Sequence, residues 1–327
     1  MRVFTLFLSA ALAVLAGSAT AQTPQPKAPD QFALQAVSPK FWELIDKDAS
    51  LEKVTSGFRF TEGPVWDEKG GFLYVSDEEQ NRVARVYPDG RVETLLNIGD
   101  PDGATFDQHH RLIETASVLR AMIRVAPDGK YEVLAGQYDG KKLNSPNDVV
   151  LGPDGALYFT DPTLDLVKGE KQELPYQGIF RMEDTGALKL LATDMAVPNG
   201  IAFSPDGTRL YVNDTRSHEI RMYDFVQGEA KNGRLFAKEA PGRGGPDGMK
   251  VDVMGNVWVT GPGGVWVFDS NGNHLGTVGL IEHPANFAWG GADFSTLYFC
   301  GLNSIYRLKT KVKGFVPYVA YAKPATP

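Results

Sequence analysis

Residues 199–214 read NGIAFSPDGTRLYVND, and residues 62–77 read EGPVWDEKGGFLYVSD. Each stretch begins with a carboxylate or carboxamide residue, continues as an apolar run, turns at a Gly-containing segment and closes a second apolar run on an aspartate. Paired runs of this kind, joined by Gly-containing turns, are typical of antiparallel strands. A polar residue stands in the same phase before four further strand pairs, at Asp102, Asn147, Asp247 and Asn286. The chain therefore repeats one β-unit six times.

The spacing of the repeat indicates the architecture. The six polar residues lie 40, 45, 52, 48 and 39 residues apart, and periods of about 40 to 50 residues are typical of propellers and related arrays. Each unit continues with two more strand-like runs, as in NRVARVYPDGRVETLL (81–96). Four short antiparallel strands form the blade of a propeller. We predict an all-β protein, a six-bladed β-propeller with four antiparallel strands per blade, preceded by a short helical element around Phe41 to Asp46.

The tripeptide Pro-Asp-Gly occurs in two phases of the repeat. Between strands, Pro presets φ, Asp bonds its own backbone and Gly supplies a positive φ; the aspartates in this phase are Asp89, Asp128, Asp154 and Asp206. Asp102 and Asp247 instead precede the first strand of a blade, in the phase of Asn147 and Asn199. We predict that the former are turn residues and that the latter point at whatever the ring encloses.

Topology places further residues on the ligand face. In an up-and-down blade, the start of the innermost strand and the end of the second strand share one face, so this face also collects Asp77, Asp161 and Asp214. The long segment Pro162–Gln177 joins a second strand to a third one there, and we expect it to overhang the axis as a lid or specificity wall. The insertion Val226–Arg234 falls on the opposite face.

Outside the repeat, the first 31 residues have the pattern of a targeting sequence followed by a spacer. A basic start, the apolar stretch Val3–Gly17 and the small residues Ala19 and Ala21 predict a signal peptide over residues 1–21, hence an exported, periplasmic or secreted protein. Residues 22–31 read as a flexible spacer, and residues 32–327 as a single propeller domain. The net charge of -7, without a basic run, argues against nucleic acid and membrane surfaces as partners. The single cysteine, Cys300, excludes an internal disulfide and reads as a buried small hydrophobe.

A closed ring would bring the six oxygen-bearing side chains together on its axis. Hard cations such as Ca²⁺ take six to eight oxygen ligands from carboxylates, amide carbonyls and water. Glu62, Asp247, Asn147 and Asn199 supply two charges and four oxygens, which neutralise a divalent ion. Because no histidine or cysteine occupies this phase, zinc and copper are disfavoured, with Zn²⁺, Mn²⁺ and Mg²⁺ kept as alternatives to Ca²⁺. The competing interpretation is that these residues only cap the turns that enter each blade.

At these residues the chain resembles the senescence marker protein, gluconolactonase and luciferin-regenerating-enzyme-like family of calcium-dependent six-bladed propellers, which includes diisopropylfluorophosphatase-type phosphotriesterases. The resemblance runs from Leu51 to about Leu308. Its most specific stretches are TEGPVW around Glu62, LNSPNDVVLGPDGALYFTDP around Asn147, VPNGIAFSPDGTRLYVNDT around Asn199 and GGPDGMKVDVMGNVWVT around Asp247. The resemblance implies that these four residues surround the metal and that Asp247 also accepts a proton.

Departures from the family pattern bear on the substrate. Bacterial gluconolactonase-type members often have Asn-Gly where this chain has Asp102-Gly103, and a Cys-Glu-His-Gly-like segment in place of residues 114–117. Ser145 stands where animal members carry a basic residue that contacts substrate. We therefore expect Asp102, Asn286, Ser145 and the amide of Asn147 to contact substrate, and a lactone other than the common sugar lactones remains open. Asp148 is expected to orient Asn147 or to form a turn.

The predicted reaction is metal-assisted hydrolysis of a lactone. Ca²⁺ polarises the carbonyl while Asp247 acts as general base toward water. The alternatives are an arylesterase or organophosphate hydrolase on the same scaffold, and a non-catalytic binding propeller. Weaker candidates for function are the pair His109-His110, expected in a solvated turn, His283, and the basic residues Lys141, Lys142 and Arg243. The sequence leaves the oligomeric state open.

Overall fold

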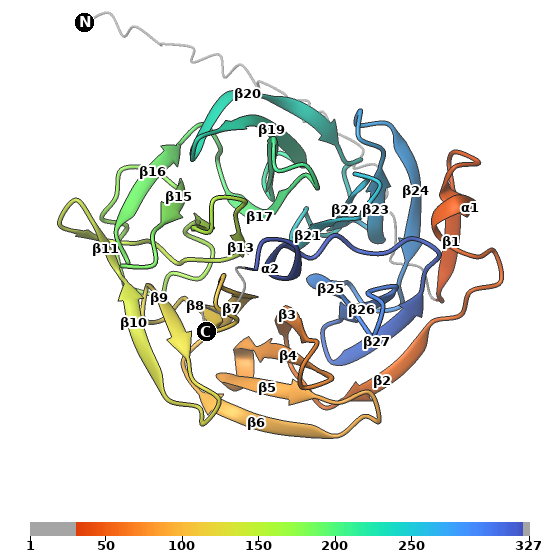
Figure 1. Cartoon of the computed structure of the whole chain (residues 1–327), viewed down its shortest axis with the longest axis horizontal. Coiled ribbons are helices and arrows are strands. Elements are labelled where there is room, and N and C mark those ends of the chain that lie inside the picture. The colour runs from red at the N-terminus through yellow and green to blue at the C-terminus, as the bar shows by residue number, and fades with distance from the viewer. Residues whose placement is uncertain (1–30, 323–327) are drawn as a thin grey trace, which may run out of the picture.

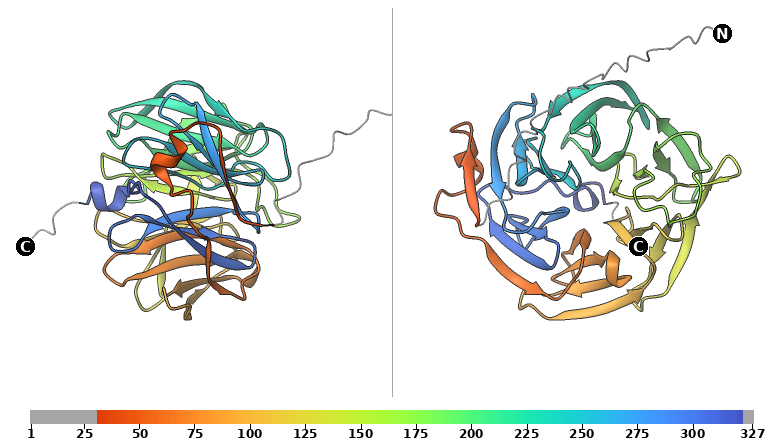
Figure 2. Two further views of the ribbon diagram at one scale, coloured as in Figure 1. Left: turned by 90° about the vertical axis from the view of Figure 1, so that its right-hand side faces the viewer. Right: turned by 180° about the vertical axis from the view of Figure 1, so that it is seen from behind.

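The computed structural model describes residues 31–322, which form a ring of six antiparallel sheets around a central axis (Figure 1). Each sheet is one blade, and its innermost strand faces the axis. Seen edge-on, the ring is a thick disc (Figure 2). The six-bladed β-propeller predicted from the repeat is thus confirmed. The predicted signal peptide, and the spacer up to residue 30, lie outside the described residues.

In the first four blades the chain runs outward from the innermost strand. The first is β3 (Thr61–Asp67), β4 (Phe72–Asp77), β5 (Arg82–Val86) and β6 (Val92–Asn97); the second is β7 (Pro101–Phe106), β8 (Leu112–Ala116), β9 (Ala121–Val125) and β10 (Tyr131–Ala135). The third is β13 (Val149–Leu151), β14 (Leu157–Asp161), β15 (Gly178–Met182) and β16 (Leu188–Ala192); the fourth is β17 (Pro198–Phe203), β18 (Arg209–Asp214), β19 (Glu219–Val226) and β20 (Glu229–Lys238). A small hairpin of β11 (Gln137–Tyr138) and β12 (Lys141–Lys142) precedes the third blade.

The last two blades take strands from the N-terminal side. The fifth consists of β21 (Met249–Val251), β22 (Val257–Gly261), β23 (Gly264–Phe268) and β24 (His274–Gly279), with β1 (Ala33–Ala36) as a fifth, outermost strand. The sixth consists of β25 (Asn286–Gly290), β26 (Thr296–Cys300) and β27 (Ser304–Lys309), and its outer strand is β2 (Glu52–Ser56). Because β2 pairs antiparallel with β27, the two ends of the repeat are hydrogen-bonded within one blade, which closes the ring.

The turn chemistry is as predicted. Asp89 Oδ1 accepts the N–H of Arg91 at 3.0 Å, and Gly90 has a φ of 88°. Asp128, Asp154 and Asp206 accept the backbone N–H two residues later in the same way. These four aspartates therefore belong to the hairpin turns.

Two short helices complete the described chain. The N-terminal helix α1 (Phe41–Leu44) lies within the predicted helical element. The second helix, α2 (Pro317–Ala320), was not predicted; it covers the centre of the ring at the end that faces the viewer in Figure 1. The Tyr318 hydroxyl donates to the carbonyl of Trp66 at 2.7 Å. Within residues 31–322, no helix has the length and apolar character needed to traverse a membrane.

Aromatic side chains hold neighbouring blades together. Trp66 of the first blade stacks on Tyr298 of the sixth with ring centroids 5.3 Å apart, and Trp258 of the fifth meets Trp289 of the sixth edge-on at 5.4 Å. All four side chains are buried. Such pairs stabilise by about 0.5 to 1.5 kcal/mol beyond their buried area, so packing between sheets fixes the blades around the axis.

Candidate metal and catalytic site

The six in-phase residues meet at one end of the axis, which we call the polar end. Each lies at or just before the start of an innermost strand, and all six of these strands begin at the same end of the ring. Five are almost fully buried, namely Glu62, Asp102, Asn147, Asn199 and Asn286, with 2 to 6% exposure, and Asp247 is half-buried. We call these six residues the ring residues.

Hydrogen bonds join ring residues of neighbouring blades in pairs. Asn286 Nδ2 donates to Glu62 Oε2 at 2.8 Å, linking the sixth blade to the first. Asn147 Nδ2 donates to Asp102 Oδ2 at 2.5 Å, linking the third to the second. Burial raises the pKa of Asp247 well above its ordinary value, and a hydrogen bond from Asn199 opposes this rise.

Two buried oxygens of the ring lack a hydrogen-bond partner among the described residues. They are Glu62 Oε1 and Asn199 Oδ1. The other oxygen of Glu62 accepts from Gly63 N and Asn286 Nδ2, and the amide nitrogen of Asn199 donates to Thr215 Oγ1 at 3.1 Å. An unsatisfied buried acceptor costs about 1 to 3 kcal/mol, so the ring holds two oxygens that a ligand would satisfy.

Negative charge is crowded at this end. Burial raises the pKa of Glu62 to about 7, and the nearby charge of Asp148 adds to the rise. Burial also raises the pKa of Asp102 well above its ordinary value, and the charges of Glu78 and Glu62 raise it further. Like charges that cannot all ionise are stabilised by a bound cation. The arrangement is therefore that of an acidic, cation-accepting site.

A second repeated feature holds the ring residues in place. In the second, third and fourth blades, a polar side chain near the end of the second strand donates to the backbone carbonyl of the ring residue in the next blade. These bonds run from Thr115 to Asn147 (2.6 Å), from Thr160 to Asn199 (2.7 Å) and from Asn213 to Asp247 (2.5 Å). The donors follow the ring residues of their own blades by 13 or 14 residues, so the repeat itself carried a signal for them that the sequence analysis missed.

The aspartates that end second strands accept backbone N–H groups of the segments that lead to the ring residues. Asp77 Oδ1 accepts Arg59 N at 3.1 Å, and Asp161 Oδ2 accepts Asn144 N at 2.9 Å. Asp214 Oδ2 likewise accepts two backbone N–H groups, of residues 196 and 197. Each side chain thus binds the segment that enters its own blade. The N–H groups that it accepts belong to residues two or three positions before the ring residue. They therefore hold the segments that lead into the ring residues.

The predicted long loop lies where the sequence placed it, at residues 162–177 between β14 and β15. Ser145 is fully buried beneath it. Its hydroxyl donates to the carbonyl of Pro162 at 2.8 Å and accepts the N–H of Asp165 at 3.2 Å. The structure thus gives Ser145 the task of anchoring this loop two residues from Asn147.

Asp148 does not contact the Asn147 side chain through any hydrogen bond in the described residues. It accepts Val149 N at 2.9 Å and Ile201 N at 3.2 Å, tying the third blade to the fourth. Its Oδ2 also lies 3.8 Å from Lys250 Nζ. Lys250 is a residue that the sequence analysis did not single out.

The turn at His109-His110 holds a different cluster. Nε2 of His110 lies 3.5 Å from Asp67 Oδ1, and its Nδ1 lies 3.5 Å from Glu68 Oε1. These three residues could hold a metal ion, but Asp67 Oδ1 already accepts two backbone N–H groups. The His110 ring stacks on Phe106 at 4.2 Å and is partly buried, while His109 is exposed, as expected for a residue in a solvated turn. This cluster lies among the hairpin turns, at the opposite end of the innermost strands from the ring residues.

Comparison with known proteins identifies a matching family. The family model described as the SMP-30/Gluconolactonase/LRE-like region matches residues 60–302. A gluconolactonase from Zymomonas mobilis is 31% identical over 332 residues, covering 93% of each chain. Pentonolactonase XacC from Haloferax volcanii is 28% identical and covers 75% of this chain and 82% of its own. The solved structure of a gluconolactonase from Xanthomonas campestris superposes with a TM-score of 0.80 at 32% identity, covering 88% of this chain and 99% of that one.

Proposed function

Because the chain belongs to the SMP-30/gluconolactonase/LRE-like family, we propose that it hydrolyses sugar lactones with a divalent cation, Ca²⁺ in the first place, bound at the ring residues. The observation that carries the proposal is the pair of unpartnered buried oxygens, Glu62 Oε1 and Asn199 Oδ1, in a ring crowded with carboxylates. Four relatives with 28 to 33% identity are named gluconolactonase or pentonolactonase, which supports a lactone as substrate.

The residues fit a hard cation. Glu62, Asn147, Asn199 and Asp247 would hold it through carboxylate and amide oxygens, the ligands that Ca²⁺ prefers. The two carboxylates neutralise its charge. The amide–carboxylate bonds between neighbouring blades orient the side chains before the ion arrives, which lowers the cost of assembling the site. When bound, the ion supplies a Lewis acid that polarises the lactone carbonyl.

The protein's own groups bind the substrate and move the proton. Asp247 is the proposed general base, which takes a proton from the attacking water. The amides of Asn147 and Asn286 have N–H groups with which to hold substrate oxygens. Asp102 accepts from Asn147 and is a further proposed substrate contact.

We also propose that the substrate is uncharged. Three more carboxylates surround the ring on its connections. They are Glu78, Asp100 and Asp165. Burial raises the pKa of Glu78, and the charges of Glu62, Asp165, Asp100 and Asp247 raise it further, which shows that these carboxylates lie close together. Among the described residues, these three carboxylates and those of Glu62, Asp102 and Asp247 form no ion pair with a basic side chain. Such a surrounding repels phosphorylated or sulfonated lactones.

The site of action is proposed to be outside the cytoplasm. The support is the N-terminal sequence alone, in which a basic start, the apolar stretch 3–17 and Ala19-Thr20-Ala21 have the form of a signal peptide. Fractionation of cells that express the full chain tests this, with N-terminal sequencing of the exported product. A mature protein that starts at Gln22 is expected, and retention of the whole chain inside the cell contradicts it.

One set of assays tests the activity. Protein stripped with a chelator and reloaded with Ca²⁺, Zn²⁺, Mn²⁺ or Mg²⁺ is offered D-glucono-1,5-lactone, D-glucono-1,5-lactone 6-phosphate, phenyl acetate and paraoxon. We expect metal-dependent hydrolysis of the uncharged lactone, and a kcat/KM at least about tenfold lower for its phosphate. Turnover of only the aryl ester or the phosphotriester would replace the lactonase assignment. No hydrolysis with any metal would leave a binding propeller.

A further inference from the structure

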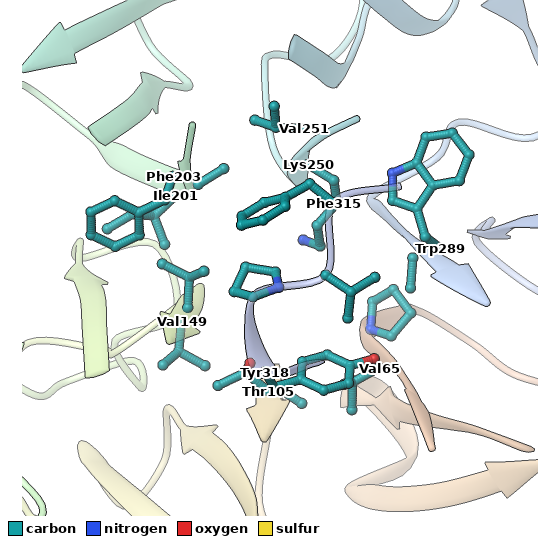
Figure 3. Close-up of a pocket in the computed structure, with 17 residues that line it drawn as sticks. Val65, Thr105, Val149, Ile201, Phe203, Lys250, Val251, Trp289, Phe315 and Tyr318 are labelled. Carbon is teal, nitrogen blue, oxygen red and sulfur yellow. The ribbon is translucent and has the colours of Figure 1, made fainter. Parts of the chain in front are cut away.

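Beyond the ring residues, the axis continues into an apolar cavity lined by all six innermost strands and by residues 315–318 (Figure 3). Three residues after the ring residue, five of the strands contribute an uncharged side chain to its wall. These are Val65, Thr105, Val150, Ala202 and Trp289. The remaining innermost strand, β21 of the fifth blade, contributes Lys250, the single charged side chain in the described lining.

The Lys250 ammonium lies close to the axis, directly beneath the ring residues. Its Nζ donates to Asn286 Oδ1 at 3.1 Å and lies 3.8 Å from Asp148 Oδ2. Asn286 belongs to the sixth blade and Asp148 to the third, so they stand on opposite sides of a six-bladed ring, and Lys250 reaches from the fifth blade into the space between them. Figure 3 shows its nitrogen pointing toward the middle of the cavity.

Lys250 is also linked to Glu62 through the side chain of Asn286. Asn286 Oδ1 accepts from Lys250 Nζ and from Phe287 N, so its Nδ2 is directed at Glu62 Oε2. That oxygen accepts Gly63 N as well, at 2.7 Å, which leaves Glu62 Oε1 as the unpartnered one. By orienting the Asn286 amide, the Lys250 ammonium thereby determines which oxygen of Glu62 has no hydrogen-bond partner.

The charges around the axis make this cation significant. Glu62, Asp102 and Asp247 lie in the ring and Asp148 lies just beneath it, and the Lys250 ammonium lies beside Asp148 and Asn286. A positive charge a few ångströms below the ring repels a divalent ion bound above it, and it compensates Asp148, which would otherwise be a buried carboxylate without a counter-ion.

We propose that Lys250 is a positioning residue of the metal site, a fixed cation beneath the ring that orients Asn286, neutralises Asp148 and weakens the hold of the ring on a divalent cation. The proposal rests on the metal dependence proposed above. It separates the two cations by role, since Lys250 belongs to the chain and the metal is a ligand.

The test measures binding and stability without turnover. Lys250→Met and Lys250→Arg proteins are stripped with a chelator and titrated with Ca²⁺ by calorimetry, and their melting temperatures are recorded with and without the ion. We expect Lys250→Met to bind Ca²⁺ roughly tenfold more tightly than the parent, and to melt at a lower temperature when metal-free because Asp148 loses its counter-ion. Lys250→Arg is expected to keep both values near those of the parent.

A role in packing alone predicts a different result, namely a lower melting temperature with unchanged or weaker Ca²⁺ binding, and that result overturns the proposal. If Lys250→Met does not fold without metal, Asp148→Asn and the double variant Asp148→Asn/Lys250→Met supply the same comparison, and the double variant is expected to bind about tenfold more tightly than the single one. A parent protein that binds no divalent cation overturns the metal-dependent function as well, whereas a parent that binds Ca²⁺ while Lys250→Met binds it no more tightly overturns only the role of Lys250.

Discussion

The two ends of the axis are built from the same six strands and have opposite chemistry. At the polar end, the strands begin with Glu62, Asp102, Asn147, Asn199, Asp247 and Asn286, and two buried oxygens have no partner among the described residues. A few residues later the same strands line an apolar cavity that α2 and the preceding residues close. Edge-on, α2 lies at one face of the disc (Figure 2), which is the face opposite the polar end.

The comparison indicates how the fold divides its tasks. The crowded carboxylates and the unpartnered oxygens Glu62 Oε1 and Asn199 Oδ1 cost free energy, and all of them lie at the polar end. Apolar packing at the other end offsets that cost. We therefore expect substitutions at the polar end to change catalysis and those at the closed end to change stability.

The largest effect is expected for Asp247→Asn at the polar end. The substitution removes the proposed base and one metal charge, so kcat for the lactone should fall by at least about 10³-fold, with metal content also reduced. Turnover, metal content by mass spectrometry and circular dichroism on the same sample measure this. Asp206→Asn, in a hairpin turn, is the matched control and should retain activity. An Asp247→Asn protein with native kcat removes Asp247 from the mechanism.

At the closed end, Tyr318→Ala should act on stability alone. Tyr318 is buried, meets Phe106 edge-on at 5.2 Å and donates to the Trp66 carbonyl. Loss of a large buried aromatic side chain costs about 3 to 5 kcal/mol, so the free energy of unfolding should fall by this amount while kcat at 25 °C stays within about twofold. Tyr318→Phe, which loses only the hydrogen bond, should cost about 1 kcal/mol. A lower kcat at unchanged stability would show that the two ends are not independent.

A pH experiment tests whether a buried carboxylate without a partner costs stability. Glu239 packs against Gly261 near the end of β22, its carboxylate oxygens have no partner among the described residues, and burial raises its pKa well above the ordinary value. A raised pKa in the folded state means that stability is full below the ordinary pKa of about 4.5 and is lost as the pH rises toward the folded pKa, by up to about 1.4 kcal/mol per pH unit.

Glu239→Gln should therefore melt at a higher temperature than the parent at pH 8, and the difference should shrink toward pH 5. Scanning calorimetry of metal-free protein from pH 5 to 8 measures the two slopes. Asp128→Asn serves as control, because the side chain of Lys130 lowers the pKa of that exposed aspartate and it titrates below this range. Equal slopes for parent and Glu239→Gln would mean that Glu239 is ionised in the folded protein at no cost.

Period and phase predicted the blades, the ring residues and the loop 162–177, because a repeat fixes both strand order and which residues start a strand. Residue type at one position could not predict interactions between blades. Thr160 and Asn213 read as ordinary strand residues until the next blade supplies the carbonyl that each one binds. Lys250 had no signal of its own, since a lysine in a strand is usually solvated. Its role depends on Asp148 and Asn286, 102 residues before it and 36 after it.

The smallest effect is expected for Asp102→Asn, which sharpens the comparison within the polar end itself. Asn at this position can still accept from Asn147 through its carbonyl oxygen, so the ring geometry should persist, while one negative charge is lost. We expect kcat/KM for D-glucono-1,5-lactone to change by only a few-fold, and the ratio of kcat/KM for its 6-phosphate to that for the uncharged lactone to rise by about three- to tenfold. Asp89→Asn, in a turn at the other end of the strands, should leave that ratio unchanged. If the ratio does not move in Asp102→Asn, the carboxylate is only a structural acceptor for Asn147, and discrimination by charge belongs to the connections that carry Glu78, Asp100 and Asp165.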